Sequence, residues 1–232
     1  MRAIFSRGDL FDDTYLLSDD RASHLIKSCR IKKGELVKIL CGDGLVKISE
    51  VDSVTRRDIT LKIKSSEKID KRSQIDLLLG LAKKDSFELS LKNACEIGIG
   101  KIYPYECEYH SWKIKNRERL LTLLESAMIQ SNNPYMVKLE EEVGTDGIHK
   151  IVDNYDYVVL ATLKNIETTT LTLDKSKKYL LVIGPEGGLS EDEEDYFLSL
   201  HNSVGIHVPT NILRAPNAVS VLSGFLYGKF DA

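Results

Sequence analysis

The sequence predicts an α/β protein in which a small strand-rich domain precedes a domain built on a parallel sheet. Before residue 70, short aliphatic and β-branched runs follow one another with turns between them. After residue 70, apolar runs typical of buried strands alternate with segments of helical periodicity, which indicates a parallel sheet covered by helices. The length of 232 residues suits two domains of modest size. We therefore expect domains at residues 1–70 and 71–232.

The first domain is expected to contain one helix and a series of strands that form a small barrel or sandwich. Ser18-Asp19-Asp20 supplies an N-cap and an acidic first turn for a helix that ends near Cys29. A Gly-Asp-Gly turn at residues 42–44 joins two of the strands as a hairpin. The predicted strands are residues 36–40, 45–48 and 59–64, and the polar residues 65–73 are the predicted linker.

The second domain is expected to alternate strands with helices. Gly98 stands where a helix C-terminus favours glycine, and Pro216 suits the first turn of the last helix. The predicted strands are residues 75–80, 101–104, 157–160 and 179–183, with amphipathic helices around residues 87–95 and 120–128.

The net charge of −3 hides a difference between the two halves. Residues 1–70 hold 14 Lys and Arg against 12 Asp and Glu, whereas residues 71–232 hold 18 against 23. Basic residues cluster in the first domain: Arg21, Lys27, Arg30, Lys32, Lys33 and Lys38. This cluster is either a solvated helix face or a patch that contacts phosphates, since binding to nucleic acid depends on where cations gather.

Several classes of protein are excluded by composition. No run approaches the roughly 20 apolar residues that a membrane span needs, and the first residues lack the apolar core of a signal peptide. The four cysteines form no CxxC pair, so we expect no metal site and a cytoplasmic, reducing location. The histidines have no partner at useful spacing and are expected to be structural or exposed: His110, His149, His201 and His207.

The segment from Ile183 to Glu194 carries the clearest chemical signal. A buried strand runs into the sequence Gly-Pro-Glu-Gly-Gly, and Ser190 with Glu193 forms an S-x-x-E capping box that starts a helix. Ligands of open α/β sheets bind beyond the carboxyl ends of strands, where small residues let the backbone approach. The acidic first turn favours a cationic or zwitterionic small molecule over a nucleoside triphosphate. The alternative is a tight turn that binds nothing.

This segment, followed by Ile212-Leu213-Arg214 and Ala218, resembles the SPOUT-class methyltransferases. Within that class it is similar to the bacterial small-subunit ribosomal RNA methyltransferase E family. Weaker matches follow in the expected order along nearly the whole chain: Arg2, Phe5, His24-Leu25, Arg30, Gly34, residues 96–99, Pro104, Ala127, Gln130-Ser131 and Pro134.

The resemblance implies both a fold and an activity. The fold would be a PUA-like β-barrel for RNA followed by a SPOUT-type α/β domain with a trefoil knot, assembled as a homodimer. The activity would be methylation of N3 of a uridine in 16S ribosomal RNA of the small ribosomal subunit, with S-adenosylmethionine as the methyl donor and no metal. The cofactor would lie among three loops in the knot.

The resemblance also implies roles for individual residues. Arg214 would be catalytic, as a cation beside the uracil; the alternative is a surface salt bridge. Cofactor contacts would come from Leu160, Thr162, Gly184, Glu186, Gly187, Gly188, Val208, Pro209, Ile212, Leu213 and Ala218. RNA contacts would come from Arg2, Arg21, Arg30, Lys33, Gln130 and Ser131, although Gln130 and Ser131 also suit a helix terminus before Pro134.

The last motif departs from the family pattern. Pro209 replaces a glycine, Asn211 replaces an arginine, and Ala215-Pro216-Asn217 replaces threonine-glutamate-threonine. Proline removes a backbone donor and restricts φ, so the loop's contact with the cofactor would differ. Two alternatives to the enzyme therefore stay open: an RNA-binding protein of weakened or lost activity on the same scaffold, and a methyltransferase with a shifted RNA target.

Overall fold

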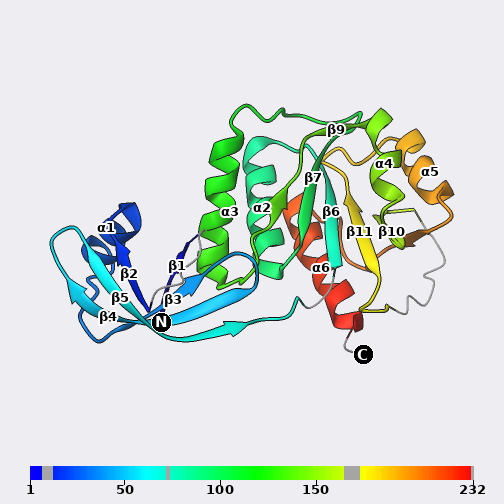
Figure 1. Ribbon diagram of the computed structural model, residues 1–232. Coiled ribbons are helices and arrows are strands. Elements are labelled where there is room, and N and C mark those ends of the chain that lie inside the picture. The colour runs from blue at the N-terminus through cyan, green and yellow to red at the C-terminus, as the bar shows by residue number, and fades with distance from the viewer. Residues whose placement is uncertain (7–12, 72–73, 165–172, 231–232) are drawn as a thin grey trace. The chain divides into compact units, whose positions relative to one another are not determined.

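The computed structural model describes residues 1–6, 13–71, 74–164 and 173–230 (Figure 1). The chain forms two compact units. The first comprises Met1–Lys71 together with Met128–Met136, and the second comprises Arg72–Ala127 and Val137–Ala232. The first segment ends beside the boundary expected at residue 70. The return of residues 128–136 to the first unit was not expected from the sequence.

The first unit is a five-stranded sheet with the order β1-β3-β4-β5-β2 and one helix. β1 pairs with β3 in parallel, and the other neighbouring pairs are antiparallel. The elements are β1 (Arg2–Phe5), β2 (Thr14–Leu17), α1 (Asp20–Lys27), β3 (Leu36–Leu40), β4 (Leu45–Val54) and β5 (Ile59–Lys68). The predicted hairpin at residues 42–44 is confirmed, and its two strands are β3 and β4.

The helix α1 begins as the sequence indicates and covers the apolar side of this sheet. Asp19 is the N-cap, because its carboxylate accepts the N–H of Arg21 at 3.0 Å. Ala22 and Leu25 of the helix are buried in a cluster with strand residues such as Val37 and Leu61. Burial of this apolar surface is the main force that holds the helix on the sheet.

The linker predicted at residues 65–73 is wrong for its first part. Residues 65–68 complete β5, where Ser65 pairs with Ile48 and Lys68 with Leu45. The side chains of residues 65–68 are polar and exposed. They therefore lack the alternation of apolar and polar residues from which a strand is predicted. Arg72 and Ser73, at the end of the predicted linker, lie outside the described residues.

Residues 128–136 are tied to the far end of this hairpin within the first unit. The N–H of Gly44 donates to the carbonyl of Pro134 at 2.9 Å, and Met136 donates to the carbonyl of Gly42 at 2.8 Å. The hydroxyl of Tyr135 donates to the carbonyl of Ile69. Gly44 has φ +98°, a conformation that favours glycine. The segment therefore supplies backbone partners that the hairpin itself lacks.

The second unit is built on a parallel sheet with the order β12-β10-β11-β6-β7-β8, and β9 also pairs with β7. All its strand pairs are parallel, as predicted. The strands are β6 (Gln74–Gly80), β7 (Lys101–Glu106), β8 (Lys138–Leu139), β9 (Val143–Gly144), β10 (Tyr157–Ala161), β11 (Lys178–Ile183) and β12 (Ser203–Ile206). β8, β9 and β12 are short and were not predicted.

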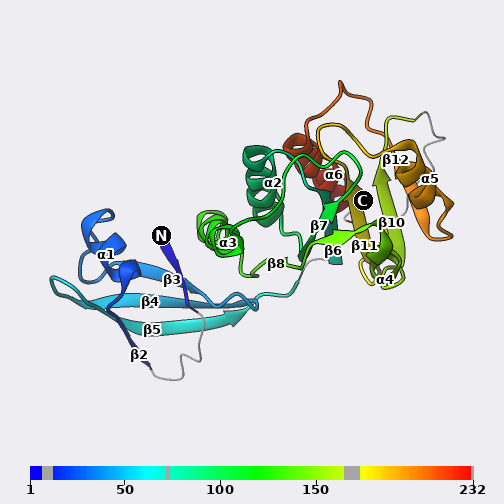
Figure 2. The same cartoon turned by 90° about the horizontal axis from the view of Figure 1, so that it is seen from above.

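Helices cover both faces of this sheet. α2 and α6 pack together on one face, and α4 and α5 lie on the other (Figures 1 and 2). Gly98 ends α2 in the left-handed conformation, as predicted. The helices are α2 (Lys84–Ile97), α3 (Arg117–Ser131), the 3-10 turn η1 (Thr145–Gly147), α4 (His149–Val152), α5 (Glu191–Ser199) and α6 (Ala215–Phe230).

Three further features bear on the protein classes that composition was used to exclude. In the described part of the chain, no helix has both the length and the apolar character needed to cross a membrane. The four cysteines are free thiols. Over the same described residues, no group of three or more His, Cys, Asp or Glu side chains could hold a metal ion.

A buried carboxylate joins β6, β7 and the segment just before β10 at the amino end of the sheet. Asp76 accepts the N–H of Lys101 at 2.8 Å and the hydroxyl of Tyr155 at 2.6 Å. The hydroxyl oxygens of Tyr155 and Tyr103 lie 3.2 Å apart. Burial, and then the charge of Asp76, raise the pKa of Tyr155 well above its ordinary value.

The substitution Tyr155→Phe is expected to destabilise the protein by about 1–3 kcal/mol at pH 7, because it leaves a buried carboxylate oxygen without its donor. The pKa of Tyr155 is raised in the folded state, so its stabilisation is complete below about pH 10 and declines as the pH rises. The stability difference between wild type and variant should therefore shrink above pH 10. Urea unfolding from pH 7 to 11 measures it, and Tyr109→Phe, which removes an exposed hydroxyl, serves as the control.

Candidate functional site

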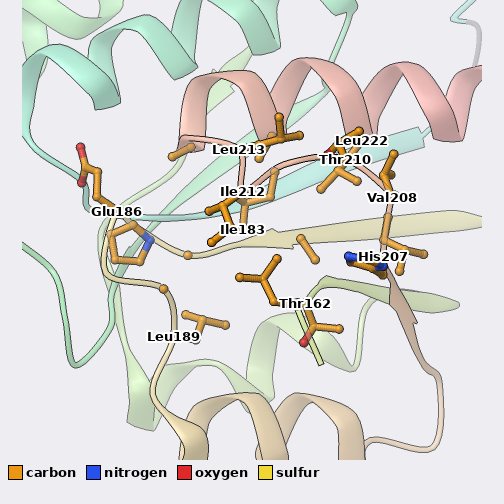
Figure 3. Close-up of a pocket in the computed structure, with 18 of the residues that line it drawn as sticks. Thr162, Ile183, Glu186, Leu189, His207, Val208, Thr210, Ile212, Leu213 and Leu222 are labelled. Carbon is orange, nitrogen blue, oxygen red and sulfur yellow. The ribbon is translucent and has the colours of Figure 1, made fainter. Parts of the chain in front are cut away.

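Three loops converge at the carboxyl edge of the parallel sheet. They follow β10, β11 and β12, which are neighbours in the order β12-β10-β11, so their carboxyl ends lie side by side. A cavity of about 430 Å³ opens among them (Figure 3). It is lined by Ala161, Thr162, Leu163, residues 183–189, Glu194, residues 206–208, residues 210–213, Ala215, Ala218 and Leu222.

The loop after β11, here called the glycine loop (residues 184–188), folds tightly on itself. The N–H of Gly188 donates to the carbonyl of Pro185 at 3.0 Å, and Gly188 has φ +77°. A Cβ on Gly184 would lie 2.9 Å from the backbone of Gly188 and of Leu189. The glycines are thus required by backbone conformation and close approach.

The glycine loop is also tied to the start of α2. Glu186 accepts the N–H of Lys83, the residue before α2, at 3.2 Å. Gly80, at the end of β6, leaves room for the ring of Pro185, because a Cβ there would come within 2.6 Å of the proline nitrogen. These contacts hold the loop beside the strand ends of β11 and β6.

The helix after the glycine loop starts with the predicted capping box. Ser190 accepts the N–H of Glu193, and the Glu193 carboxylate accepts the N–H of Ser190 at 2.9 Å. Glu193 is buried, and its other oxygen accepts the Tyr105 hydroxyl at 2.6 Å and the N–H of Glu108 at 3.0 Å. Burial, and then this bond to Glu193, raise the pKa of Tyr105. The amino end of α5 is therefore anchored to β7.

The loop after β12 forms the apolar side of the cavity. Ile212 is 80% exposed although it is a large apolar residue, and Leu213 follows it, two residues before α6 begins. Figure 3 shows Leu213 and Leu222 on the side of α6, with Thr162 and Leu189 on the side of α5. An exposed isoleucine beside a cavity offers apolar surface for a ligand to cover.

The charged side chains that line the cavity are acidic. Among the described residues that line it, they are Glu186 and Glu194, and none of these described residues is a Lys or Arg. The Thr162 hydroxyl donates to the Glu194 carboxylate at 3.4 Å, and Lys164 lies 3.5 Å from the same carboxylate. Lys164 is closer to Asp195, at 2.7 Å. This lining suits a cationic or neutral ligand and disfavours a polyphosphate.

Most of the residues that the resemblance assigns to the cofactor line this cavity. Leu160 does not, because its side chain is fully buried in the core between the sheet, α4 and α5. Pro209 is exposed and is not among the lining residues. Those that line it are Thr162, Gly184, Glu186, Gly187, Gly188, Val208, Ile212, Leu213 and Ala218.

Arg214 is exposed and stands between two lining residues, Leu213 and Ala215. Its carbonyl accepts the N–H of Ala218, which opens α6. Among the residues that the structure describes, its guanidinium has no ion-pair partner, so the surface salt bridge considered from the sequence does not form with any of them.

Two of the arginines assigned to RNA are engaged within the first unit. Arg2 donates to Glu35 and to the carbonyl of Cys29, both at 2.6 Å. Arg21 donates to Asp19, to the carbonyl of Phe5 and to the Tyr15 hydroxyl. The side-chain bond from Arg21 lowers the pKa of Asp19. Both guanidiniums therefore brace the fold.

The other residues assigned to RNA lie at more open positions. Arg30 is exposed and has φ +50°, and Lys33 is exposed, 3.8 Å from Asp52. Gln130 and Ser131 form the end of α3, in the first unit, and the Ser131 hydroxyl donates to the carbonyl of Met128 at 3.3 Å. The helix-terminus interpretation of these two residues is thus correct for the backbone.

Sequence reasoning missed several lining residues, among them His207, Glu194 and Leu222. His207 was expected to be structural or exposed; it is exposed and also lines the cavity. It follows β12, a four-residue strand whose alternation of Val204 and Ile206 is too short a signal to stand out. Glu194 stands next to the capping box, and helical geometry from Glu193 could have placed it on a different side of α5.

Known proteins of similar sequence support a common family. The family model for the RNA methyltransferase domain matches residues 70–226. The chain is 24% identical over 207 residues to ribosomal RNA small subunit methyltransferase E of Rickettsia conorii, covering 87% of this chain and 84% of that protein. It is 26% identical over 204 residues to ribosomal RNA small subunit methyltransferase E 2 of Borreliella burgdorferi, covering 84% and 83%.

Solved structures extend the likeness to the fold. Ribosomal RNA small subunit methyltransferase E of Neisseria gonorrhoeae, bound to S-adenosyl methionine, matches with a TM-score of 0.86 at 18% identity, covering 98% of this chain and 97% of that chain. The shared fold is a PUA-like β-barrel followed by a SPOUT-type α/β unit. Because the family model spans more than half of the chain, the protein belongs to the RNA methyltransferase domain family, and it resembles the ribosomal RNA small subunit methyltransferase E group.

Proposed function

We propose that the protein is an S-adenosylmethionine-dependent methyltransferase that modifies N3 of a uridine in 16S ribosomal RNA of the small subunit, in the cytoplasm. The observation that carries the proposal is the cavity at the carboxyl edge of the sheet, in a chain of the RNA methyltransferase domain family. The names of the similar proteins support ribosomal RNA of the small subunit as the substrate.

The residues of the cavity fit S-adenosylmethionine. About 430 Å³ is within the usual range for pockets that take small molecules. Ile212 and Leu213 offer apolar surface for an adenine ring, and the glycine loop brings backbone groups to the cavity wall. The acidic lining suits a sulfonium cation. When bound, S-adenosylmethionine supplies an electrophilic methyl group.

The chain's own residues have distinct tasks in this proposal. Thr162, Val208, Ala218 and the glycine loop hold the cofactor, and Leu160 supports the loop after β10 from within the core. Pro209 limits the conformations of the loop after β12. The apolar walls exclude water from the reacting atoms.

Arg214 is the proposed catalytic residue. Uracil acquires negative charge as its N3 loses a proton, and a nearby guanidinium stabilises that charge. Its exposed position between two lining residues supports this role, because it leaves the guanidinium accessible to RNA.

The first unit is the proposed RNA-binding unit. The exposed cations Arg30 and Lys33 are suited to phosphates, together with Gln130 and Ser131 at the end of α3. Arg2 and Arg21 contribute by holding the unit in shape.

We also propose that the protein is a homodimer. Val221 and Phe225 expose apolar surface on α6, and each is 37% exposed in the single chain. Such surface on the most apolar of the long helices favours burial against a second copy. Light scattering coupled to gel filtration would show twice the 26.1 kDa mass of one chain.

The central experiment incubates the protein with labelled S-adenosylmethionine and unmethylated small subunits, and then maps the modified nucleoside. Transfer to N3 of one uridine is the expected result. RNA binding without transfer would support the weakened RNA-binding protein instead. Transfer to a different nucleoside would support the shifted target.

The substitution Gly184→Ala is expected to weaken S-adenosylmethionine binding by at least about tenfold, because its Cβ meets the backbone of Gly188 and forces the glycine loop to move. Calorimetric titration measures the affinity. Gly144→Ala is the matched control, since a Cβ there meets nothing within 4 Å. Equal affinity in both variants would remove the glycine loop from the binding site.

The substitution Arg214→Ala is expected to lower kcat for methyl transfer by roughly a hundredfold and to leave S-adenosylmethionine affinity within about twofold, since Arg214 does not line the cavity. Arg214→Lys should recover part of the rate. Arg119→Ala is the control, because Arg119 is paired with Glu88 and also does not line the cavity. Full turnover in the Arg214→Ala variant would exclude a catalytic role.

A further inference from the structure

Glu194 is placed against the cavity by two neighbouring elements. It lies in the first turn of α5, and its side chain is only 18% exposed. The hydroxyl of Thr162, at the end of β10, donates to the carboxylate, with the two oxygens at 3.4 and 3.5 Å. The carboxylate thus stands at the amino end of α5, where the positive end of the helix dipole lies.

The charge of Glu194 is only partly balanced. Lys164 lies 3.5 Å from Glu194 but 2.7 Å from Asp195, so one cation is shared between two carboxylates. The group of Lys164, Glu194 and Asp195 keeps a net charge of about −1. Glu186, the other acidic lining residue, is exposed and bonded to the N–H of Lys83. Of the two acidic lining residues in the described part of the chain, Glu194 is therefore the more sheltered.

Methyl transfer changes the charge of the ligand by one unit. The bond between sulfur and the methyl carbon breaks, and sulfur keeps the electron pair and becomes a neutral thioether. The methyl carbon bonds to N3 of the uracil, whose proton is released to solvent. S-adenosylmethionine and S-adenosylhomocysteine thus share the adenosine and the amino acid but differ in the sulfonium charge.

We propose that Glu194 is a specificity-determining residue whose carboxylate makes the cavity prefer the sulfonium ligand S-adenosylmethionine over the neutral product S-adenosylhomocysteine. The inference rests on the proposed function and deepens it. A partly sheltered carboxylate at the cavity wall attracts the sulfonium charge and has no such interaction with the thioether. The preference for S-adenosylmethionine limits inhibition by S-adenosylhomocysteine, because the neutral product is not attracted to the carboxylate and dissociates more readily.

The test is the ratio of the two dissociation constants, measured by calorimetric titration of each ligand alone without RNA. Wild type should bind S-adenosylmethionine more tightly than S-adenosylhomocysteine. In Glu194→Gln the preference should fall by about three- to tenfold, and the loss should lie in the affinity for S-adenosylmethionine. Lys164→Met should raise the preference, because Glu194 then loses its partial counter-charge.

Glu191→Gln is the matched control. It makes the same change of charge on the same turn of α5, but Glu191 does not line the cavity, so the ratio should stay that of wild type. Thr162→Val removes the hydroxyl that holds Glu194 and should lower the preference in the same direction as Glu194→Gln. Circular dichroism melts of each variant establish that it is folded.

Two results would overturn the inference and leave the proposed function in place. In the first, Glu194→Gln weakens both ligands equally, which assigns Glu194 to the shared amino group or to loop support. In the second, the ratio is unchanged in Glu194→Gln and in Lys164→Met. A wild-type protein that binds neither ligand contradicts the proposed function itself, and it is recognised before any variant is compared.

Discussion

The buried carboxylate of Glu193 is the interaction on which the functional edge of the second unit depends. It accepts hydrogen bonds from Ser190, Tyr105 and Glu108, and so joins the start of α5 to the chain around the end of β7. A buried carboxylate with fewer donors would be costly, so each of these three hydrogen bonds helps to keep Glu193 in place. The glycine loop lies immediately before α5, so the hydrogen bonds of Glu193 also fix the end of this loop. Glu194 is the next residue of the helix, and the same hydrogen bonds fix its position. It lines the cavity, whereas Glu193 is buried in the core.

Much of the fold could be predicted because its signals are local. The hairpin turn at residues 42–44, the capping box at Ser190 and the end of α2 at Gly98 are each written in a few adjacent residues. The end of β5 could not be predicted, because its exposed polar residues are held by pairing with β4 and not by an apolar pattern. β12 could not be predicted for a related reason: it is a four-residue strand at the edge of the sheet, and its apolar pattern is short.

Prediction of the candidate site from the sequence was limited in a different way. The glycine loop was recognisable from its own sequence, but the cavity needs the neighbouring order of β12, β10 and β11, which no local pattern encodes. The family resemblance predicted which three loops surround the cofactor. The burial of individual side chains shows which residues of those loops line the cavity. Leu160, for example, faces the core, whereas Thr162, two residues further on, lies past the end of β10 and lines the cavity. Pairing within the first unit likewise distinguishes Arg2 and Arg21 from the open Arg30.

The segment Met128–Met136 makes the first unit discontinuous in sequence. Gly42, Gly44 and Ile69 each hydrogen-bond to a residue of this segment, which is synthesised after all the strands of the first unit, and Ile69 also donates to the carbonyl of Gly44. On the ribosome, the barrel therefore waits for α3 to emerge before its far end is closed. Because of the same discontinuity, the first unit cannot be exchanged between proteins as one continuous segment. A chimera that replaces it must carry both of its chain segments, and a single crossover would separate them.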